Sequence, residues 1–310
     1  MRPRAHEISR RIGALDALDG PAKAIGKKIR ELLPAGPVKD ALSGTWLGHP
    51  LHPLLTDVPI GTWTSATILD LVGGRAGRPA ARRLIGVGLL AAGPTAWAGW
   101  SDWADSEVGD EEVRCVGMVH AAANGGAVLL YGASLLARRA GAHRTGVLLG
   151  LAGAGAVGAG GWLGGDLAYA RGTGVDQTAF HELPQDWTPV LDASMLGDDR
   201  PTAATAGDVP VMVVRRNGVL HALADRCSHR GGPLHEGELV GDCIECPWHA
   251  SRFRLDDGSV EQGPAAYPQP VFEARERDGR IEIRAARELA AQENPMTLRM
   301  PSWASISSKP

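Results

Sequence analysis

Two short stretches, CSHRGG at residues 227–232 and CPWHAS at residues 246–251, decide the fold of the C-terminal part of the chain. Each supplies one Cys and one His, as Cys-x-His and then Cys-x-x-His. Two thiolates and two imidazoles can bind zinc tetrahedrally. They can also hold a two-iron, two-sulfide cluster, with both Cys on one iron and both His on the other. The candidate ligands are Cys227, His229, Cys246 and His249.

The residues around these ligands favour iron over zinc. Gly231, Gly232 and Pro233 follow the first pair, and Pro247 lies inside the second. Small, rigid loops allow the backbone to approach closely, so that its N–H groups can bond the sulfides. Zinc fingers usually seat their histidines on a helix, and the sequence shows none here. An iron–sulfur site is therefore the prediction, with zinc as the alternative.

The extended motifs CSHRGGPL and CPWHASRF, followed by DGSVEQGPAAYPQP, resemble a Rieske domain over roughly residues 187–286. The resemblance implies that Cys227 and Cys246 bind one iron, and His229 and His249 the other. It also places Ser251 where its hydroxyl could donate a hydrogen bond toward the cluster and raise its potential; a Ser that faces solvent is the alternative.

The first loop has no second cysteine, which is similar to the ferredoxin and oxygenase branch of the Rieske family. That resemblance implies a potential toward the low end of the Rieske range, which spans about −150 to +300 mV. Cys243 lies three residues before Cys246 and forms a Cys-x-x-Cys pattern with it. Because iron would occupy Cys246, we interpret Cys243 as a plain thiol. Four cysteines are too few for a disulfide scaffold at this length.

The sequence around the two loops has a β pattern. The stretch VPVMVVRRNGVLHAL predicts two strands joined by a turn at Asn217-Gly218. The stretch FEARERDGRIEIR predicts a second pair of strands joined by a turn at Asp278-Gly279. Asn-Gly and Asp-Gly between alternating apolar residues are strong hairpin signals. We therefore expect an all-β Rieske domain at residues 187–286.

The preceding region is apolar and rich in glycine. Four apolar segments lie at about residues 54–74, 84–100, 115–137 and 146–164. Segments of about 20 residues suit a bilayer, and small residues four apart let helices approach closely in lipid. We expect an all-α transmembrane four-helix bundle, with a soluble buried bundle as the alternative.

Two further stretches support this interpretation. LGHPLHPLLTDVPIG at residues 47–61 and GGWLGGDLAYARGTGVD at residues 160–176 resemble a family of four-span membrane proteins of unknown function that is known fused to Rieske domains. The resemblance covers about residues 45–176.

An even number of spans places several polar residues at one membrane face. Ionisable groups inside spans are costly and are functional candidates. We expect either a redox site there, holding haem b or a quinone, or polar contacts that fix helix packing. His120 is the strongest candidate because it lies inside a span. The candidate residues are His49, His52, Asp57, Asp102, His120 and Asp166.

The expected organisation is multi-domain. An amphipathic N-terminal segment of one or two helices covers residues 1–45. The membrane domain covers residues 46–176, the Rieske domain 187–286, and a C-terminal tail 287–310. The fold class is an all-α transmembrane bundle followed by an all-β iron–sulfur domain.

These features predict a membrane-anchored one-electron carrier. A Rieske oxygenase also needs a mononuclear iron, typically held by two His and a carboxylate on a large domain, but the tail after residue 286 is short and has no His. The chain is therefore expected to serve as a component of an oxidoreductase, with reductase or oxygenase proteins as redox partners. The alternatives are a quinol- or haem-linked oxidoreductase subunit and a non-redox zinc-binding membrane protein.

Charge and cysteine content bear on the partners and the cellular location of the protein. The net charge of −3 gives no reason to expect nucleic acid as a partner. The arginines in the links between apolar segments and the basic N-terminal segment give opposite topology signals. Free thiols suit a reducing compartment. We expect a multi-pass protein of the cell membrane with its Rieske domain on the cytoplasmic side.

Overall fold

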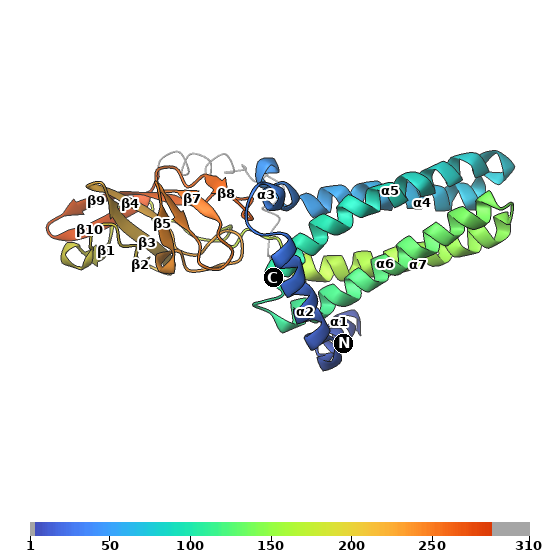
Figure 1. Cartoon of the computed structure of the whole chain (residues 1–310). Helices are drawn as coiled ribbons and strands as arrows, with labels where there is room; N and C mark the ends of the chain where they lie inside the picture. Colours follow the sequence, from blue (N-terminus) through green and yellow to red (C-terminus); the bar gives the residue numbers. More distant parts are fainter. Residues whose placement is uncertain (1–3, 287–310) are drawn as a thin grey trace, which may run out of the picture. The chain divides into compact units, whose positions relative to one another are not determined.

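The computed structural model describes residues 4–286, and the expected tail at 287–310 lies outside the described residues. The chain forms two compact units (Figure 1). The first contains residues 4–176 together with the short segments 249–251 and 262–267, and the second contains the remainder. The first unit contains the described α-helices, and the second is built from β-strands.

The N-terminal segment forms three short helices rather than the expected one or two. The first break falls at Ala14 and Leu15, and the second at the stretch PAGP, where Gly36 adopts a φ of 140°. Proline at 37 then begins the next helix at a position where its missing N–H costs nothing. The helices are α1 (Arg4–Gly13), α2 (Asp16–Leu32) and α3 (Pro37–Ser43).

Four long helices follow, joined by short connections. In Figure 1, α4 runs beside α5, and α6 runs beside α7. All four contribute to one apolar cluster, in which the rings of Trp63 and Tyr131 stack with centroids 4.4 Å apart. A short π-helical turn, Asp166–Ala170, ends the last of them. The helices are α4 (Leu51–Val72), α5 (Gly74–Ser106), α6 (Glu111–Arg139) and α7 (His143–Gly165).

Each consecutive pair of long helices is joined by an aromatic ring that lies against a glycine. A methyl group on any of these glycines would collide with the ring that faces it. Ring and glycine therefore form a matched pair, which we call a ring–glycine key. The keys are Trp63 on Gly88 between α4 and α5, Trp103 on Gly117 between α5 and α6, and Tyr131 on Gly153 between α6 and α7.

Two segments, Glu111–Arg139 and His143–Ala170, are long and apolar enough to cross a membrane. They correspond to the third and fourth expected spans. Polar residues explain why α4 does not pass the same test, because it carries Asp57 and Asp70 among several Thr and Ser. Helix α5 begins with an arginine-rich stretch and is rich in Gly and Ala. The first two expected spans stay predictions.

One arginine at the end of an apolar segment, Arg138, is not a loop charge. Arg138 is buried and binds Asp70 on α4 with both terminal nitrogens, with Nη1 to Oδ1 at 2.7 Å. Its Nε also donates to Ser134 Oγ at 3.1 Å, and Ser134 Oγ donates to the Gly146 carbonyl at 2.5 Å. This ion pair joins α4, α6 and α7, so the charge of Arg138 serves packing.

The second unit contains two antiparallel sheets. The larger has the strand order β1-β10-β9-β4-β3-β2, and the smaller has the order β5-β6-β7-β8. The larger sheet comprises β1 (Thr188–Asp192), β2 (Thr202–Ala206), β3 (Val209–Arg216), β4 (Val219–Ala224), β9 (Val271–Arg277) and β10 (Arg280–Ala285). The smaller comprises β5 (Glu238–Val240), β6 (Cys243–Glu245), β7 (Arg252–Arg254) and β8 (Val260–Gln262).

The structure confirms both expected hairpins. Asn217 and Gly218 have φ values of 52° and 78°, and Asp278 and Gly279 have 51° and 74°. Two successive residues with positive φ form the turn type that matches the twist of paired strands. The hairpins set the register of β3 with β4 and of β9 with β10. Alternate residues of these strands, including Val211, Val213 and Ile281, fill the core.

Candidate metal centre

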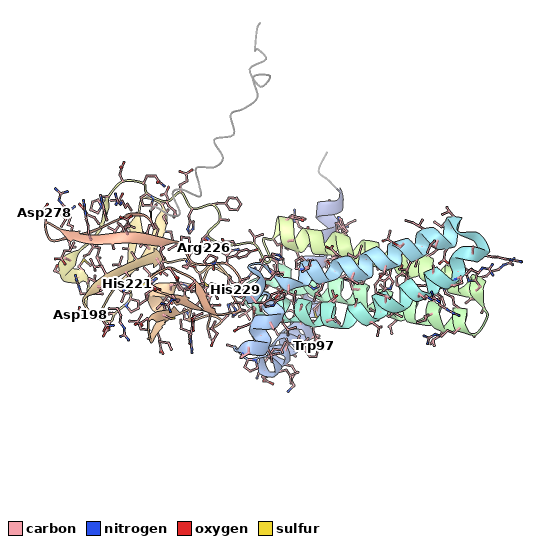
Figure 2. The ribbon with its side chains drawn as sticks, turned by 90° about the horizontal axis from the view of Figure 1, so that it is seen from above. Trp97, Asp198, His221, Arg226, His229 and Asp278 are labelled. Atoms are coloured by element: carbon pink, nitrogen blue, oxygen red, sulfur yellow. The ribbon has the colours of Figure 1, made fainter. Side chains whose placement is uncertain are left out.

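The two sheets position the two Cys and His loops. The first loop begins directly after β4 and carries Cys227 and His229, and the second joins β6 to β7 and carries Cys246 and His249. Figure 2 shows His229 at one end of the strands and Asp278, in the β9–β10 turn, at the other. The rigid strands therefore present the loops together at one end of the sheets, away from the hairpin tip.

The two cysteine thiols lie against each other. Cys227 is 1% exposed and Cys246 is 2% exposed. The neighbouring Cys246 thiol and burial together hold the pKa of Cys227 well above its usual range. Two buried thiolates side by side repel each other, so the pair favours a bound cation that would compensate their charge. The donor set therefore fits a thiolate-bound metal.

Backbone N–H groups point at the sulfur of Cys227. The N–H groups of His229 and Arg230 donate to this sulfur and lower the pKa of Cys227. Their effect is smaller than that of the Cys246 thiol and of burial, which raise the pKa. The loop is closed by two bonds, from Cys227 N to Gly232 O at 2.9 Å and from Gly231 N to Cys227 O at 2.8 Å. Gly231 takes a φ of 78°, which favours glycine. Such N–H donors stabilise a metal-bound thiolate.

Gly232 leaves room for the second loop. A Cβ on Gly232 would lie 2.8 Å from Cys246 Sγ and 3.0 Å from Trp248 Cγ. Any larger residue would push the two loops apart. The expectation that small residues permit close approach of the loops is thus met at this position.

The two histidines have a different environment from the cysteines. His229 and His249 are half-buried, although Nδ1 of His229 is itself buried. Ala250, which follows His249, takes a φ of 58°, an uncommon conformation for alanine. Two buried thiols and two half-buried imidazoles are the ligand types of a cluster whose two irons have different ligands.

Comparison with known proteins agrees with this geometry. Residues 186–273 match the model of the Rieske [2Fe-2S] domain. Over 98 residues the chain is 33% identical to the anthranilate 1,2-dioxygenase ferredoxin subunit of Burkholderia cepacia, a match that covers 32% of this chain and 91% of that protein. The chain belongs to the Rieske family. Its N-terminal residues 48–177 match a second family, described as predicted membrane protein (DUF2231).

Other relatives share the same Rieske part. Ferredoxin CarAc of Metapseudomonas resinovorans is 35% identical over 77 residues, which are 25% of this chain and 72% of that protein. Apoptosis-inducing factor 3 of Mus musculus is 33% identical over 78 residues, but these cover only 13% of that protein. A solved complex of reduced oxygenase and oxidized ferredoxin in carbazole 1,9a-dioxygenase aligns over 32% of this chain and 94% of the matched chain, with 32% identity and a TM-score of 0.30.

Ser251 of the Rieske domain is fully buried, which removes the alternative of a Ser that faces solvent. Its Oγ accepts a hydrogen bond from the Ala265 N–H at 3.0 Å. That bond uses a lone pair and leaves the hydroxyl proton available for donation. Donation toward the cluster stays a prediction.

We expect Ser251→Ala to lower the reduction potential of the Rieske protein by about 40 mV, because one lost hydrogen bond of about 1 kcal/mol no longer stabilises the more negative reduced state. A redox titration monitored by EPR measures the shift. Ser259→Ala, which removes a hydroxyl bonded to the exposed Asp257, is the matched control and should leave the potential unchanged. A Ser251→Ala potential equal to that of the wild type would contradict the assignment.

Gln269 is a further positioning residue that sequence reasoning missed. It is 1% exposed, and its side chain makes three hydrogen bonds to the first cluster loop. Nε2 donates to the carbonyls of Ala224 at 2.6 Å and Arg226 at 2.7 Å, and Oε1 accepts from Ser228 N at 3.0 Å. In the sequence Gln269 stands between two prolines in YPQP, and this pattern does not indicate which backbone groups the amide binds.

We expect Gln269→Ala to lower both the cluster content and the melting temperature. The change leaves two carbonyls and one N–H of the loop without their partner, at a cost of about 1–3 kcal/mol for a buried unsatisfied group. Iron analysis and thermal unfolding measure the two effects. Gln185→Ala, which removes a single bond from an exposed side chain, should change neither. Unchanged iron content and melting in Gln269→Ala would refute the role.

Cys243 lies in β6 rather than in either loop. Cys243 is buried and forms no disulfide. Burial, followed by the charge of Glu261, raises the pKa of its thiol. A thiol with a raised pKa is a poor nucleophile. The interpretation as a plain thiol is consistent with this environment.

The candidate polar site of the membrane domain divides into separate parts. His49 is exposed, with Nδ1 within 3.0 Å of the Pro50 carbonyl, and Asp57 is also exposed. Asp166 accepts hydrogen bonds from Arg171 Nε at 2.8 Å and from Ser9 Oγ at 2.5 Å. Arg171 also pairs with Glu112. The Asp166 carboxylate therefore belongs to an ion-pair network that fixes the N-terminal helix.

Two histidines of the expected set do come together. The ring centroids of His52 and His120 lie 6.4 Å apart. Asp102 is half-buried in α5, near the end of the helix where Lys39 binds Asp105 at 2.7 Å. The structure thus brings His52 and His120 together, whereas Asp166 contacts Ser9 and Arg171.

Proposed function

We propose that the protein is a membrane-anchored Rieske-type carrier of single electrons. The observation that carries the proposal is the pair of Cys and His loops, with buried adjacent thiols and N–H donors to Cys227, in a domain related to ferredoxin subunits. Cys227, His229, Cys246 and His249 would hold the cluster. When bound, a [2Fe–2S] cluster accepts and releases one electron.

The protein's own residues prepare this site for electron transfer. The buried cysteines and the Gln269 bonds keep the loop geometry fixed, so little rearrangement accompanies a change of charge. Pro247 and Trp248 of the second loop are exposed, and Trp248 has 55% of its surface accessible. An exposed aromatic beside a redox site is a suitable contact for a partner protein.

The packing of the long helices supports a membrane location. Glycines and alanines are buried among the helices, including Gly88, Ala127 and Gly150, while large apolar side chains point outward. Leu90 and Leu129 are 81% and 75% exposed, and Trp97, labelled in Figure 2, is 50% exposed. Small residues inside and large apolar residues outside are typical of helices that pack in lipid. We propose that all four long helices span the bilayer as a bundle.

The partners follow from the relatives. The ferredoxin subunit of Burkholderia cepacia is named as part of an anthranilate dioxygenase. We propose that this chain likewise receives an electron from a reductase and passes it to an oxygenase or another oxidoreductase. It would then be the transfer component rather than the catalyst. A zinc-binding membrane protein remains the competing function.

Anaerobic purification of the full-length protein in detergent tests the proposal. We expect two iron and two acid-labile sulfide per chain, a Rieske-type EPR signal after dithionite reduction, and reduction by one electron per chain. Protein that contains zinc, has no EPR signal and is colourless would replace this function with the zinc-binding one. Recovery of the chain in the soluble fraction after alkaline carbonate washing of membranes would refute the anchor.

We further propose that the Rieske domain lies on the cytoplasmic side. The cysteines at 115, 227, 243 and 246 form no disulfide, which suits a reducing compartment. Protease treatment of spheroplasts should then leave the domain intact until the membrane is opened. Cleavage of the domain in intact spheroplasts would place it outside.

A further inference from the structure

Two histidine rings on different helices of the membrane domain lie close together. His52 lies in the first turn of α4, and His120 lies in the third turn of α6. Their ring centroids are 6.4 Å apart and their planes meet at 79°. Both side chains are partly buried among the helices.

Each ring is held by a backbone carbonyl of a neighbouring helix. Nδ1 of His52 lies 2.9 Å from the Thr95 carbonyl on α5, and Nδ1 of His120 lies 2.8 Å from the Gly160 carbonyl on α7. A carbonyl oxygen can only accept, so Nδ1 donates in both cases. In the neutral ring Nε2 then keeps its lone pair. At His120 the amide nitrogen of Asn124, which donates to the His120 carbonyl at 2.9 Å, also lies 3.3 Å from Nε2, and a bound iron would replace this second contact. Metal-binding histidines are typically oriented and held in one tautomer in this way.

The separation of the rings suits coordination of one metal ion by both. A metal–imidazole bond is about 2.0–2.1 Å long, and a ring nitrogen lies about 1 Å from the centroid, so two imidazoles on opposite sides of one ion have centroids about 6 Å apart. The observed 6.4 Å is close to this value.

The number of ligands distinguishes haem iron from a bare ion. Apart from the two Cys and His loops of the Rieske domain, no group of three or more His, Cys, Asp or Glu side chains among residues 4–286 is placed to hold a metal ion. A structural or catalytic metal ion usually takes at least three protein ligands. Haem iron takes four nitrogens from the porphyrin and needs only two axial ligands, and histidine is a usual one.

Glycines lie against both rings. A Cβ on Gly99 would be 2.7 Å from His52 Cε1, and a Cβ on Gly164 would be 3.1 Å from His120 Cε1. The outer faces of the helices are apolar. A flat, apolar macrocycle is compatible with such surroundings, whereas a hydrated ion is not.

We propose that His52 and His120 bind the iron of one haem as its two axial ligands, each through Nε2. The inference goes beyond electron transfer by the Rieske domain and does not depend on it. Haem content and cluster content are read by different signals, so failure of one proposal is distinguishable from failure of the other.

The experiment titrates hemin into the full-length protein in detergent and records reduced-minus-oxidised visible spectra. The informative variants are His52→Asn and His120→Asn. The Asn amide can still donate to the Thr95 or Gly160 carbonyl, but it cannot replace the imidazole as a ligand. His49→Asn is the matched control, because His49 is exposed and bonds only a neighbouring carbonyl. Far-UV circular dichroism and thermal unfolding in detergent verify that the helical domain of each variant is folded.

We expect the wild type and His49→Asn to bind one hemin per chain with a sharp α-band on reduction. His52→Asn and His120→Asn should lose that band and bind hemin at least tenfold more weakly. His120→Met should keep six-coordinate haem with a higher potential, because methionine is also an axial ligand. A residue that only fixed packing would not produce this shift.

Three results would overturn the proposal. The first is wild-type protein that carries its cluster but binds no hemin. The second is hemin binding by both Asn variants at wild-type affinity. The third is a transition metal bound without porphyrin and lost in the Asn variants, which would make the pair an ion site instead.

Discussion

Cys227→Ser should yield a protein without a [2Fe–2S] cluster. The Cys227 sulfur is buried against Cys246 and accepts N–H bonds from His229 and Arg230, so a serine hydroxyl would place a weaker and shorter ligand at the centre of the site. Thiolate ligation, not packing, holds such clusters. We expect iron and sulfide to fall from two per chain to near zero and the EPR signal to disappear.

Cys243→Ser is the matched control. Cys243 is also buried in the same domain, and its sequence spacing to Cys246 imitates a redox pair. This variant should keep two iron and two sulfide per chain. Full cluster content in Cys227→Ser, or loss of the cluster in Cys243→Ser, would show that the ligands are assigned wrongly.

Arg138→Met should strongly destabilise the helical domain. The change removes the guanidinium that pairs with Asp70 through two nitrogens, and leaves a carboxylate with 5% of its side chain exposed. Removing one partner of a buried ion pair typically costs about 3–5 kcal/mol. Thermal unfolding of the protein in detergent, or its yield in membranes, measures the loss.

Two variants separate the ion pair from general effects of charge removal. Arg139 is adjacent and exposed, so Arg139→Met should leave the melting temperature nearly unchanged. The double variant Asp70→Asn with Arg138→Met should recover much of the stability, because no unpaired charge remains. If Arg138→Met and Arg139→Met are equally stable, the buried pair contributes nothing.

The Rieske loops could be predicted from the sequence because local chemistry determines them. Four ligands at fixed spacing, glycines at close approach, and Asn-Gly and Asp-Gly turns are all properties of short segments. The structure confirms the hairpins and the close approach at Gly232. The thiol contact between Cys227 and Cys246 follows from the same pattern.

Long-range partnerships could not be predicted. Gln269 lies about 40 residues from the loop that it holds, and Arg138 pairs with Asp70 at a separation of 68 residues. A single sequence gives no information on which polar residue meets which across helices. Arg138 directly follows the apolar segment 115–137, so the sequence alone presents it as a loop charge.

For the candidate membrane site, the sequence likewise predicts only part of the arrangement of its residues. Placement at one end of the spans grouped His52 with His120, and the structure places their rings 6.4 Å apart because both lie near the N-terminal ends of α4 and α6. It could not tell which side of each helix faces inward. His49 and Asp57 are exposed, and Asp166 pairs with Arg171.

The ring–glycine keys have a consequence for the order of assembly during synthesis. Every key joins two helices that follow each other directly in the chain. When a helix is synthesised, the preceding helix that carries the matching ring is therefore already present. The two helices can pack together before the next helix leaves the ribosome. Because the ring packs only where the glycine leaves room, each contact fixes the position of one helix relative to the other along their common axis. The four long helices can thus be assembled stepwise, from the first to the last, without waiting for the Rieske domain.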